Sequence, residues 1–155
     1  MSIKAIVFKQ YMDKVNRVAM KTRNIEFPPE GWLCTARKAL GMSAAQLARR
    51  LGVTRAQVSN TEKGELNGSV TLKTLQSQAE AMGCRLVYAI VPPRKVEDIL
   101  AARAKQKAKR RVVETGKHMA LEVQALSEKQ IKFEIDRLQN DILKNLPADF
   151  WDDEE

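Results

Sequence analysis

The chain has few of the residues that build catalytic and metal sites. Its 155 residues include one histidine and two cysteines. His118 has no serine, cysteine or carboxylate pattern around it that is typical of a catalytic triad. Cys34 and Cys84 lie far apart in the sequence, without the clustered cysteines or histidines of a metal-ligand motif. We therefore predict a protein that is not an enzyme, with no metal and no cofactor, and with both thiols reduced and buried.

Long apolar runs are also missing. No run approaches the roughly 18 residues that a membrane-spanning helix needs. The sequence shows no basic segment followed by an apolar one that is typical of a secretion signal. We expect a cytosolic protein that does not contact a membrane.

Acidic residues are fewer than basic ones, 19 against 27, which gives a formal net charge of +8. Residues 1–93 carry 14 basic and 6 acidic groups, a net +8, and residues 94–118 carry 9 and 3, a net +6. Residues 119–155 carry 4 and 10, a net −6. The basic part favours a polyanionic partner such as double-stranded DNA, because each lysine or arginine at a phosphate releases a condensed counterion. The acidic end is electrically different from the rest.

Two short helices with a tight turn between them are predicted in the middle of the chain. Ser43 and Gln46 have the spacing of a capping box, which predicts a helix from Ala44, and Gly52 can end it in the left-handed conformation. Thr54 then provides a second N-cap and Gly64 a second stop.

The second of these helices has a short polar face almost free of acids. With 100° per residue, Val58, Thr61 and Glu62 point one way, and Ala56, Asn60 and Lys63 the other, flanked by Gln57 and Ser59. A helix of this width fits the major groove, where Arg55 suits guanine and Asn60 suits adenine. The alternative is an ordinary helical hairpin with a solvated polar face.

The stretch from Trp32 to about Leu86 resembles the helix-turn-helix of XRE/Cro-like repressors, through the segment Thr35 to Ser43 and the two capped helices. The resemblance implies that the helix after Thr54 is the recognition helix. It also implies a partly buried structural ion pair between Arg37 and Glu62. The expected DNA contacts are Ser43, Thr54, Arg55, Ala56, Gln57, Ser59, Asn60, Lys63 and Asn67.

Further helices are predicted on either side of this motif. Apolar residues at helical spacing predict an amphipathic leading helix from Ile3 to about Met20, and a helix that begins after Thr71 and ends at Gly83. Trp32 opens a helix that runs to Leu40 and is expected to be a packing anchor.

Residues 84–91 form a β-branched and aromatic run closed by two prolines, which reads as a strand. A single strand needs a partner for its backbone groups. The simplest partner is the same strand of a second copy, in a homodimer that pairs through Leu86, Val87, Tyr88, Ala89 and Ile90. The alternatives are pairing with Ile3–Phe8 of the same chain, or a buried helix end.

The C-terminal part is expected to be helical with an acidic tail. A helix from Lys95 to Val113 has a basic outer face, which is either solvated or in contact with the DNA backbone. A later apolar stripe has helical spacing and ends before Pro147; it consists of Ile131, Ile135, Leu138, Ile142 and Leu146. The stripe either folds back on its own domain or binds another protein, and the acidic tail could also cover the chain's own DNA face.

A more specific resemblance comes from three segments, residues 28–32, 83–89 and 118–122. They are similar to the bacterial "mobile mystery protein A" family, which is related to antitoxins and typically accompanies a Fic-domain protein. The resemblance implies a DNA-binding antitoxin whose partner is a Fic-domain toxin, located in the bacterial cytoplasm at the nucleoid.

These observations predict a mainly α fold, an XRE/Cro-like helix-turn-helix domain with one C-terminal β-strand and helical N- and C-terminal extensions. The expected parts are residues 1–27, 28–93 with the dimerisation strand 84–91, and 94–155. The predicted function is a sequence-specific, autoregulating repressor that binds a palindromic operator as a homodimer. The alternatives are an antitoxin that mainly holds a Fic toxin, and a stand-alone repressor of a mobile element.

Overall fold

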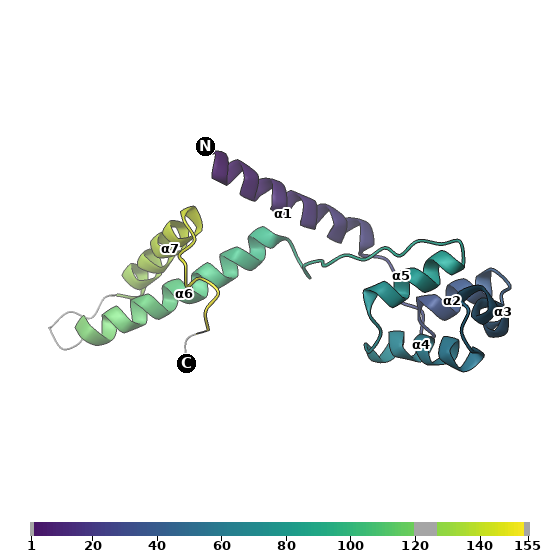
Figure 1. Cartoon of the computed structure of the whole chain (residues 1–155). Coiled ribbons are helices and arrows are strands. Elements are labelled where there is room, and N and C mark those ends of the chain that lie inside the picture. Colours follow the sequence, from purple (N-terminus) through teal and green to yellow (C-terminus); the bar gives the residue numbers. More distant parts are fainter. Residues whose placement is uncertain (1, 120–126, 154–155) are drawn as a thin grey trace. The chain divides into compact units, whose positions relative to one another are not determined.

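The computed structural model of the chain describes residues 2–119 and 127–153, and every regular element in these ranges is a helix (Figure 1). Ala120, Leu121 and Glu122, part of the third segment that resembles a known family, lie outside the described residues. The helices are α1 (Ile3–Thr22), α2 (Trp32–Ala39), α3 (Ala44–Leu51), α4 (Arg55–Asn67), α5 (Leu72–Ala81), α6 (Val96–Met119) and α7 (Glu128–Lys144). None of them is long and apolar enough to cross a membrane, within the part of the chain that is described.

The described chain divides into two compact units. Unit 2 is continuous and spans residues 22–89, with α2 to α5. Unit 1 is discontinuous and joins residues 1–21 with residues 90–155, so α1 shares a unit with α6 and α7.

The core of unit 2 lies between α2, α3, α4 and the end of α5. Leu47 and Val58 are fully buried, and Leu33, Ala48 and Met82 complete the cluster. The four helices are only 8 to 13 residues long, so each of them supplies only a few apolar residues to this core.

Helix starts in unit 2 follow their caps. Complete capping boxes form at Ser43 with Gln46 and at Thr54 with Gln57, and the Thr71 side chain accepts from the Thr74 N–H. Gly52, at φ +69°, ends α3 in the left-handed region.

The predicted stop of α4 at Gly64 was wrong. The helix continues to Asn67 and ends at Gly68, which has φ +77°. Gly64 is buried, and a Cβ on it would lie 3.1 Å from Ser69 Oγ. The glycine at position 64 therefore permits close packing of the chain that follows the helix, instead of ending the helix.

The predicted β-strand at residues 84–91 was also wrong, since no strand occurs in the described residues. The segment has no regular structure, and Val87, Tyr88 and Ile90 are exposed. Pairing with Ile3–Phe8 is excluded because those residues are helical, and the exposure excludes a buried helix end. Residues that favour β-structure form a strand only where another strand pairs with their backbone N–H and C=O groups, and no described segment pairs with residues 84–91.

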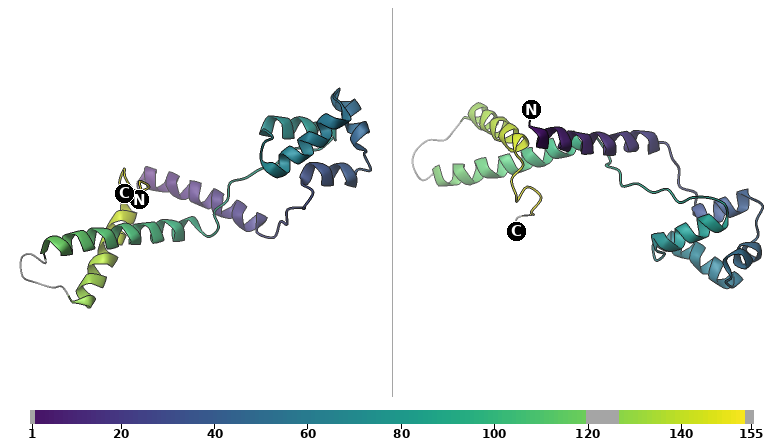
Figure 2. Two further views of the ribbon diagram at one scale, coloured as in Figure 1. Left: turned by 90° about the horizontal axis from the view of Figure 1, so that it is seen from below. Right: turned by 45° about the horizontal axis from the view of Figure 1, so that its top comes forward.

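In unit 1, α7 packs against α6, as Figures 1 and 2 show from three directions. The core contains Leu100, Ala104 and Ala108 from α6, Ile142 from α7, and Phe150, which is 1% exposed. Part of the predicted C-terminal stripe, Ile135, Leu138, Ile142 and Leu146, belongs to this core. The stripe therefore folds back on its own chain.

Two basic residues of α6 fix the segment after α7. Arg103 Nε donates to the Phe150 carbonyl at 2.9 Å, and the Arg103 guanidinium lies 5.8 Å from the centre of the Trp151 ring. Lys107, itself buried, donates to the Asp149 carbonyl. These contacts hold the Phe150 ring against α6, so part of the basic surface predicted for this helix serves the fold.

Candidate nucleic-acid interface

The candidate interface is the exposed face of α4, which follows Thr54 directly. Thr54 Oγ1 accepts from the Gln57 N–H at 3.1 Å, and Gln57 Oε1 accepts from the Thr54 N–H at 2.9 Å. This reciprocal cap satisfies backbone groups at both ends of the first turn and defines where α4 begins.

Five predicted contact residues lie together on the exposed side of α4. Arg55, Ala56, Ser59, Asn60 and Lys63 are all exposed and recur at helical spacing. They provide one guanidinium, one ammonium, one amide and one hydroxyl, the donor and acceptor set that reads base edges and phosphates. No acidic side chain of α4 belongs to this face, because Glu62 and Glu65 both contact α2.

Other predicted contacts are engaged in caps and turns. The Ser43 hydroxyl accepts from the Gln46 N–H at 3.1 Å, and the Gln57 amide is held in the Thr54 cap. Asn67, the last residue of α4, accepts from the Ser69 N–H through Oδ1 at 3.0 Å. These three side chains make hydrogen bonds that stabilise the start of α3 and the two ends of α4. Since the side-chain oxygen of Gln57 accepts from the Thr54 N–H, the side-chain donor of Gln57 is its amide nitrogen.

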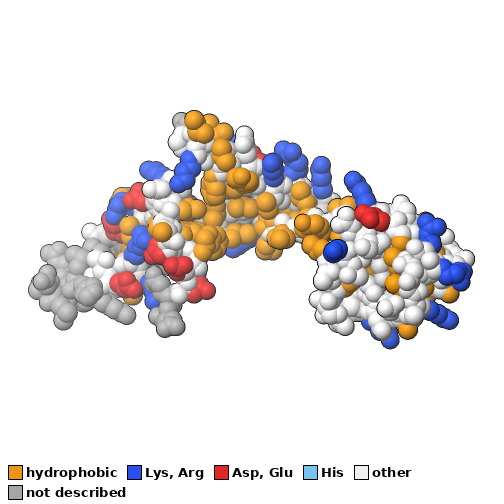
Figure 3. All heavy atoms as spheres, viewed as in Figure 1, with side chains coloured by type: hydrophobic (Ala, Val, Ile, Leu, Met, Phe, Trp, Pro, Cys, Tyr) orange, Lys and Arg blue, Asp and Glu red, His pale blue; other side chains and the backbone are white. Residues whose placement is uncertain are grey.

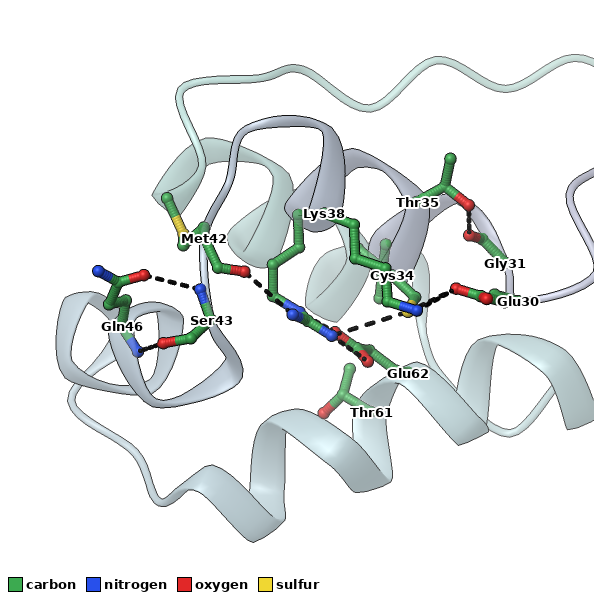
Figure 4. A network of polar contacts seen from close by, with 12 residues as sticks. Glu30, Gly31, Cys34, Thr35, Lys38, Met42, Ser43, Gln46, Thr61 and Glu62 are labelled. Carbon is green, nitrogen blue, oxygen red and sulfur yellow. Dashed lines mark hydrogen bonds and ion pairs between the residues drawn. The ribbon is translucent and has the colours of Figure 1, made fainter.

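An ion pair joins α2 to α4 on the side of α4 that contacts α2. Arg37 Nε lies 2.6 Å from Glu62 Oε1, and Nη2 lies 3.2 Å from Oε2, so the contact is bidentate. Arg37 Nη1 also donates to the Met42 carbonyl at 3.0 Å, in the turn before α3. The two side chains are 11% and 14% exposed, and the hydrogen bonds that Arg37 donates to Glu62 raise the pKa of Arg37. One guanidinium therefore ties together α2, α4 and the turn (Figure 4).

A second polar group lies on α2 beside this pair (Figure 4). Lys38 Nζ donates to Glu30 Oε2 at 2.7 Å, and the Cys34 thiol donates to the same oxygen at 3.3 Å. The Lys38 hydrogen bond lowers the pKa of Glu30, and burial raises the pKa of Cys34. Cys34 is buried and Cys84 is exposed, so the prediction that both thiols are buried was wrong for Cys84.

Sequence reasoning missed the role of Glu65. Its carboxylate accepts from the Trp32 N–H at 2.7 Å and from the Leu33 N–H at 2.8 Å, at the start of α2. The N-cap position of α2 is Gly31, which has no side chain to do this. Gly31 has φ +85°, and a Cβ there would lie 3.0 Å from the Glu65 carboxylate. Two features of the sequence could have indicated this role. The helix α2 has no capping side chain at its start, and Glu65 lies three residues after Glu62, on the same face of α4.

Trp32, predicted to be a packing anchor, is half exposed. Its ring lies edge-on to Phe27, with the ring centres 6.4 Å apart. No group of three or more histidine, cysteine, aspartate or glutamate side chains in the described residues could hold a metal ion.

Comparisons with known proteins match the helix-turn-helix family HTH_3 over residues 35–88. The match begins in α2 and includes α3, α4 and α5. No curated protein and no solved structure matches the chain. The comparisons do not support the more specific resemblance to the mobile mystery protein A family. Residues 35–88 are therefore an XRE-type helix-turn-helix domain, a DNA-binding regulatory domain.

Proposed function

We propose that this protein is a sequence-specific transcriptional repressor that binds a palindromic operator as a homodimer. The observation that carries the proposal is the exposed face of α4, with Arg55, Ser59, Asn60 and Lys63 in one patch. The acids of the same helix are turned to α2. A helix with such a face enters the major groove, and a two-fold dimer places two of them about one DNA turn apart.

The first experiment is a gel shift with the DNA upstream of the protein's own gene, random duplex as competitor, and several salt concentrations. A specific repressor gives a shift that resists the competitor, at affinities typically about a thousandfold or more above those for random DNA. Weak binding to both DNAs that vanishes with added salt would show a purely electrostatic, non-specific surface and would contradict the proposal.

Substitution of the two base-reading candidates tests the assignment of α4. Arg55→Ala and Asn60→Ala should each relax base preference at one operator position and cost roughly 1–3 kcal/mol in specific binding. Arg137→Ala is a matched control, because Arg137 is exposed on α7 and pairs with Glu134 and Asp141. If Arg55→Ala and Asn60→Ala bind operator and random DNA as Arg137→Ala does, the role of α4 is refuted.

A second proposed function is that of an antitoxin that neutralises a Fic-domain toxin and represses its own operon from the bacterial nucleoid. Its support is the resemblance of residues 28–32, 83–89 and 118–122 described above. Co-purification with the product of a neighbouring gene tests it. A neighbouring gene that encodes no such enzyme would favour a stand-alone repressor.

A further inference from the structure

A groove with a charged lining lies along α6, beside the end of the segment that follows α7. Arg103, Lys107 and Arg110 are spaced by four and three residues, so they lie on one side of α6. The lining of this groove, which we call the α6 groove, includes these three residues, Arg111, Glu114 and the two acids Asp152 and Asp153, which we call the tail acids. Figure 3 shows acidic and basic side chains close together in this part of unit 1. The chain therefore places its own acids beside a row of its own cations.

The segment after α7 is held on α6 by contacts of two kinds. As far as Phe150, it is anchored by the buried ring and by the carbonyl groups that Arg103 and Lys107 bind. Beyond Phe150, Arg103 Nη2 donates to the Asp152 carbonyl at 2.8 Å, and Arg103 Nη1 lies 3.2 Å from Asp153 Oδ1. The Asp153 side chain is 94% exposed, and an ion pair this exposed contributes little to stability. The carboxylates of the tail acids are therefore not what anchors Phe150, and another anion can replace them.

The α6 groove has an excess of positive charge when the tail acids are left out. The lining then contains four cations and one acid, Glu114, whose carboxylate lies 3.5 Å from Arg110 Nε, so the net charge is +3. The tail acids lower it to +1. Three of the four cations are arginines, and a planar guanidinium can bind a phosphate through two parallel hydrogen bonds. A row of phosphates also releases counterions when it binds, which allows it to compete with two carboxylates.

We propose that the α6 groove binds the phosphates of a DNA backbone, and that the tail acids compete with DNA for this groove. The choice of DNA among polyanions rests on the helix-turn-helix domain at residues 35–88 of the same chain. The proposal goes beyond the repressor function, because α6 lies outside that domain. Binding at the α6 groove does not depend on base sequence, since contacts with phosphates carry no sequence information directly.

The test is the affinity of the full chain for a random duplex, measured by fluorescence anisotropy at several salt concentrations. We expect the double variant Asp152→Asn/Asp153→Asn to bind about five to ten times more tightly than the parent at about 0.1 M salt, with a steeper salt dependence. Asp13→Asn/Asp136→Asn is the matched control, because it changes the net charge equally at two exposed positions of unit 1 that do not line the groove. The control should bind nearly as the parent does.

Removal of two arginines tests whether the gain arises in the α6 groove. Arg110 and Arg111 are exposed, whereas Arg103 and Lys107 also hold the segment that carries Phe150. Arg110→Ala/Arg111→Ala should abolish most of the gain of the Asp152→Asn/Asp153→Asn variant and weaken the parent much less, since the tail acids already occupy the groove there. Lys105→Ala/Lys109→Ala, at exposed positions of α6 outside the groove, should weaken both proteins equally. An unchanged melting temperature shows that each variant folds.

Three outcomes would overturn the proposal. The Asp152→Asn/Asp153→Asn variant could bind as its matched control does, or Arg110→Ala/Arg111→Ala could weaken both backgrounds equally. Polyglutamate of equal charge could also displace the duplex as well as unlabelled duplex does, which would identify an acidic polypeptide as the ligand instead of phosphates. Failure of the repressor function is distinguishable, because the operator gel shift is measured separately. Tail-dependent binding to random DNA without any operator contradicts only the repressor, and operator binding without tail dependence contradicts only the α6 groove.

Discussion

At the scale of single residues, two glutamates of α4 hold α2 in place against α4. Glu62 binds the Arg37 guanidinium, and Glu65 caps the first turn of α2. Both side chains contact α2 and are not free on the exposed face. The acids near the candidate DNA surface are therefore occupied within the protein, and their charges are neutralised by a guanidinium or by the positive end of a helix.

Removal of the ion pair should lower stability more than it changes base preference. We expect Glu62→Ala to reduce the free energy of unfolding by about 2 kcal/mol, because it leaves Arg37 partly buried without its partner. Thermal or urea unfolding measures this. Glu30→Ala, which breaks the exposed Lys38 pair, is the control and should have little effect. A melting temperature of Glu62→Ala equal to that of the parent would refute the structural role.

The two thiols should differ in reactivity. A thiol reagent at neutral pH should modify the exposed Cys84 quickly and Cys34 only after unfolding. Burial raises the pKa of Cys34, so the folded protein keeps its proton at a pH where the unfolded chain has lost it. The contribution of Cys34 to stability is thus present below the ordinary thiol pKa and is lost as the pH rises through the folded value. Equal modification rates of both thiols in the folded chain would contradict this.

Among the elements, the α6–α7 pair depends on one aromatic ring supplied by the segment after α7. Phe150 is almost fully buried in the core of unit 1, and Phe150→Ala should cost about 3–5 kcal/mol. Chemical denaturation followed by circular dichroism measures the loss. Trp151→Ala is the control, because Trp151 is largely exposed and should cost much less. Equal losses in the two variants would show that Phe150 is not the anchor.

The helices of unit 2 could be predicted from the sequence because their signals are local. Ser43, Thr54 and Thr71 each make a cap within three residues, and the first helical residue follows directly. Features that depend on packing and contacts outside the first turn of a helix were missed. Gly64 reads as a stop but packs against Ser69, and the cap of α2 comes from Glu65, 33 residues after Trp32.

The strand predicted at residues 84–91 is absent for a related reason. Their composition favours extended backbone, but a strand also requires a second segment at hydrogen-bonding distance, which composition cannot supply. In the candidate site, the types and spacing of Arg55, Ser59 and Asn60 were sufficient to identify one face of α4. The engagement of Gln57 and Asn67 in a cap and a turn became visible only in the structure.

In the whole molecule, the two units have separate cores. The unit 2 core is built around Leu47 and Val58, and the unit 1 core around Phe150 and the alanines of α6. No residue is shared between the two clusters.

Substitutions in the two cores should therefore act independently. Leu47→Ala should lower protection from hydrogen exchange in α3 and α4, and Phe150→Ala in α6 and α7, each with little effect on the other unit. The stability losses in the double variant should add within about 0.5 kcal/mol. A Leu47→Ala variant that lost protection equally in both units would show that the chain unfolds as one body.

Because unit 1 is discontinuous in the sequence, the two units can complete their folding only in a certain order during synthesis. The ribosome releases α1 first, but Val96 and Glu97, which bind Asn16, follow 80 and 81 residues later. All of α2 to α5 is made in the interval, so the core of unit 2 can form before the α6 residues that contact α1 are synthesised. A polypeptide released early, just after Ala89, would contain every residue of that core and lack most of unit 1. The folding of unit 2 therefore does not depend on completion of the chain, whereas that of unit 1 does.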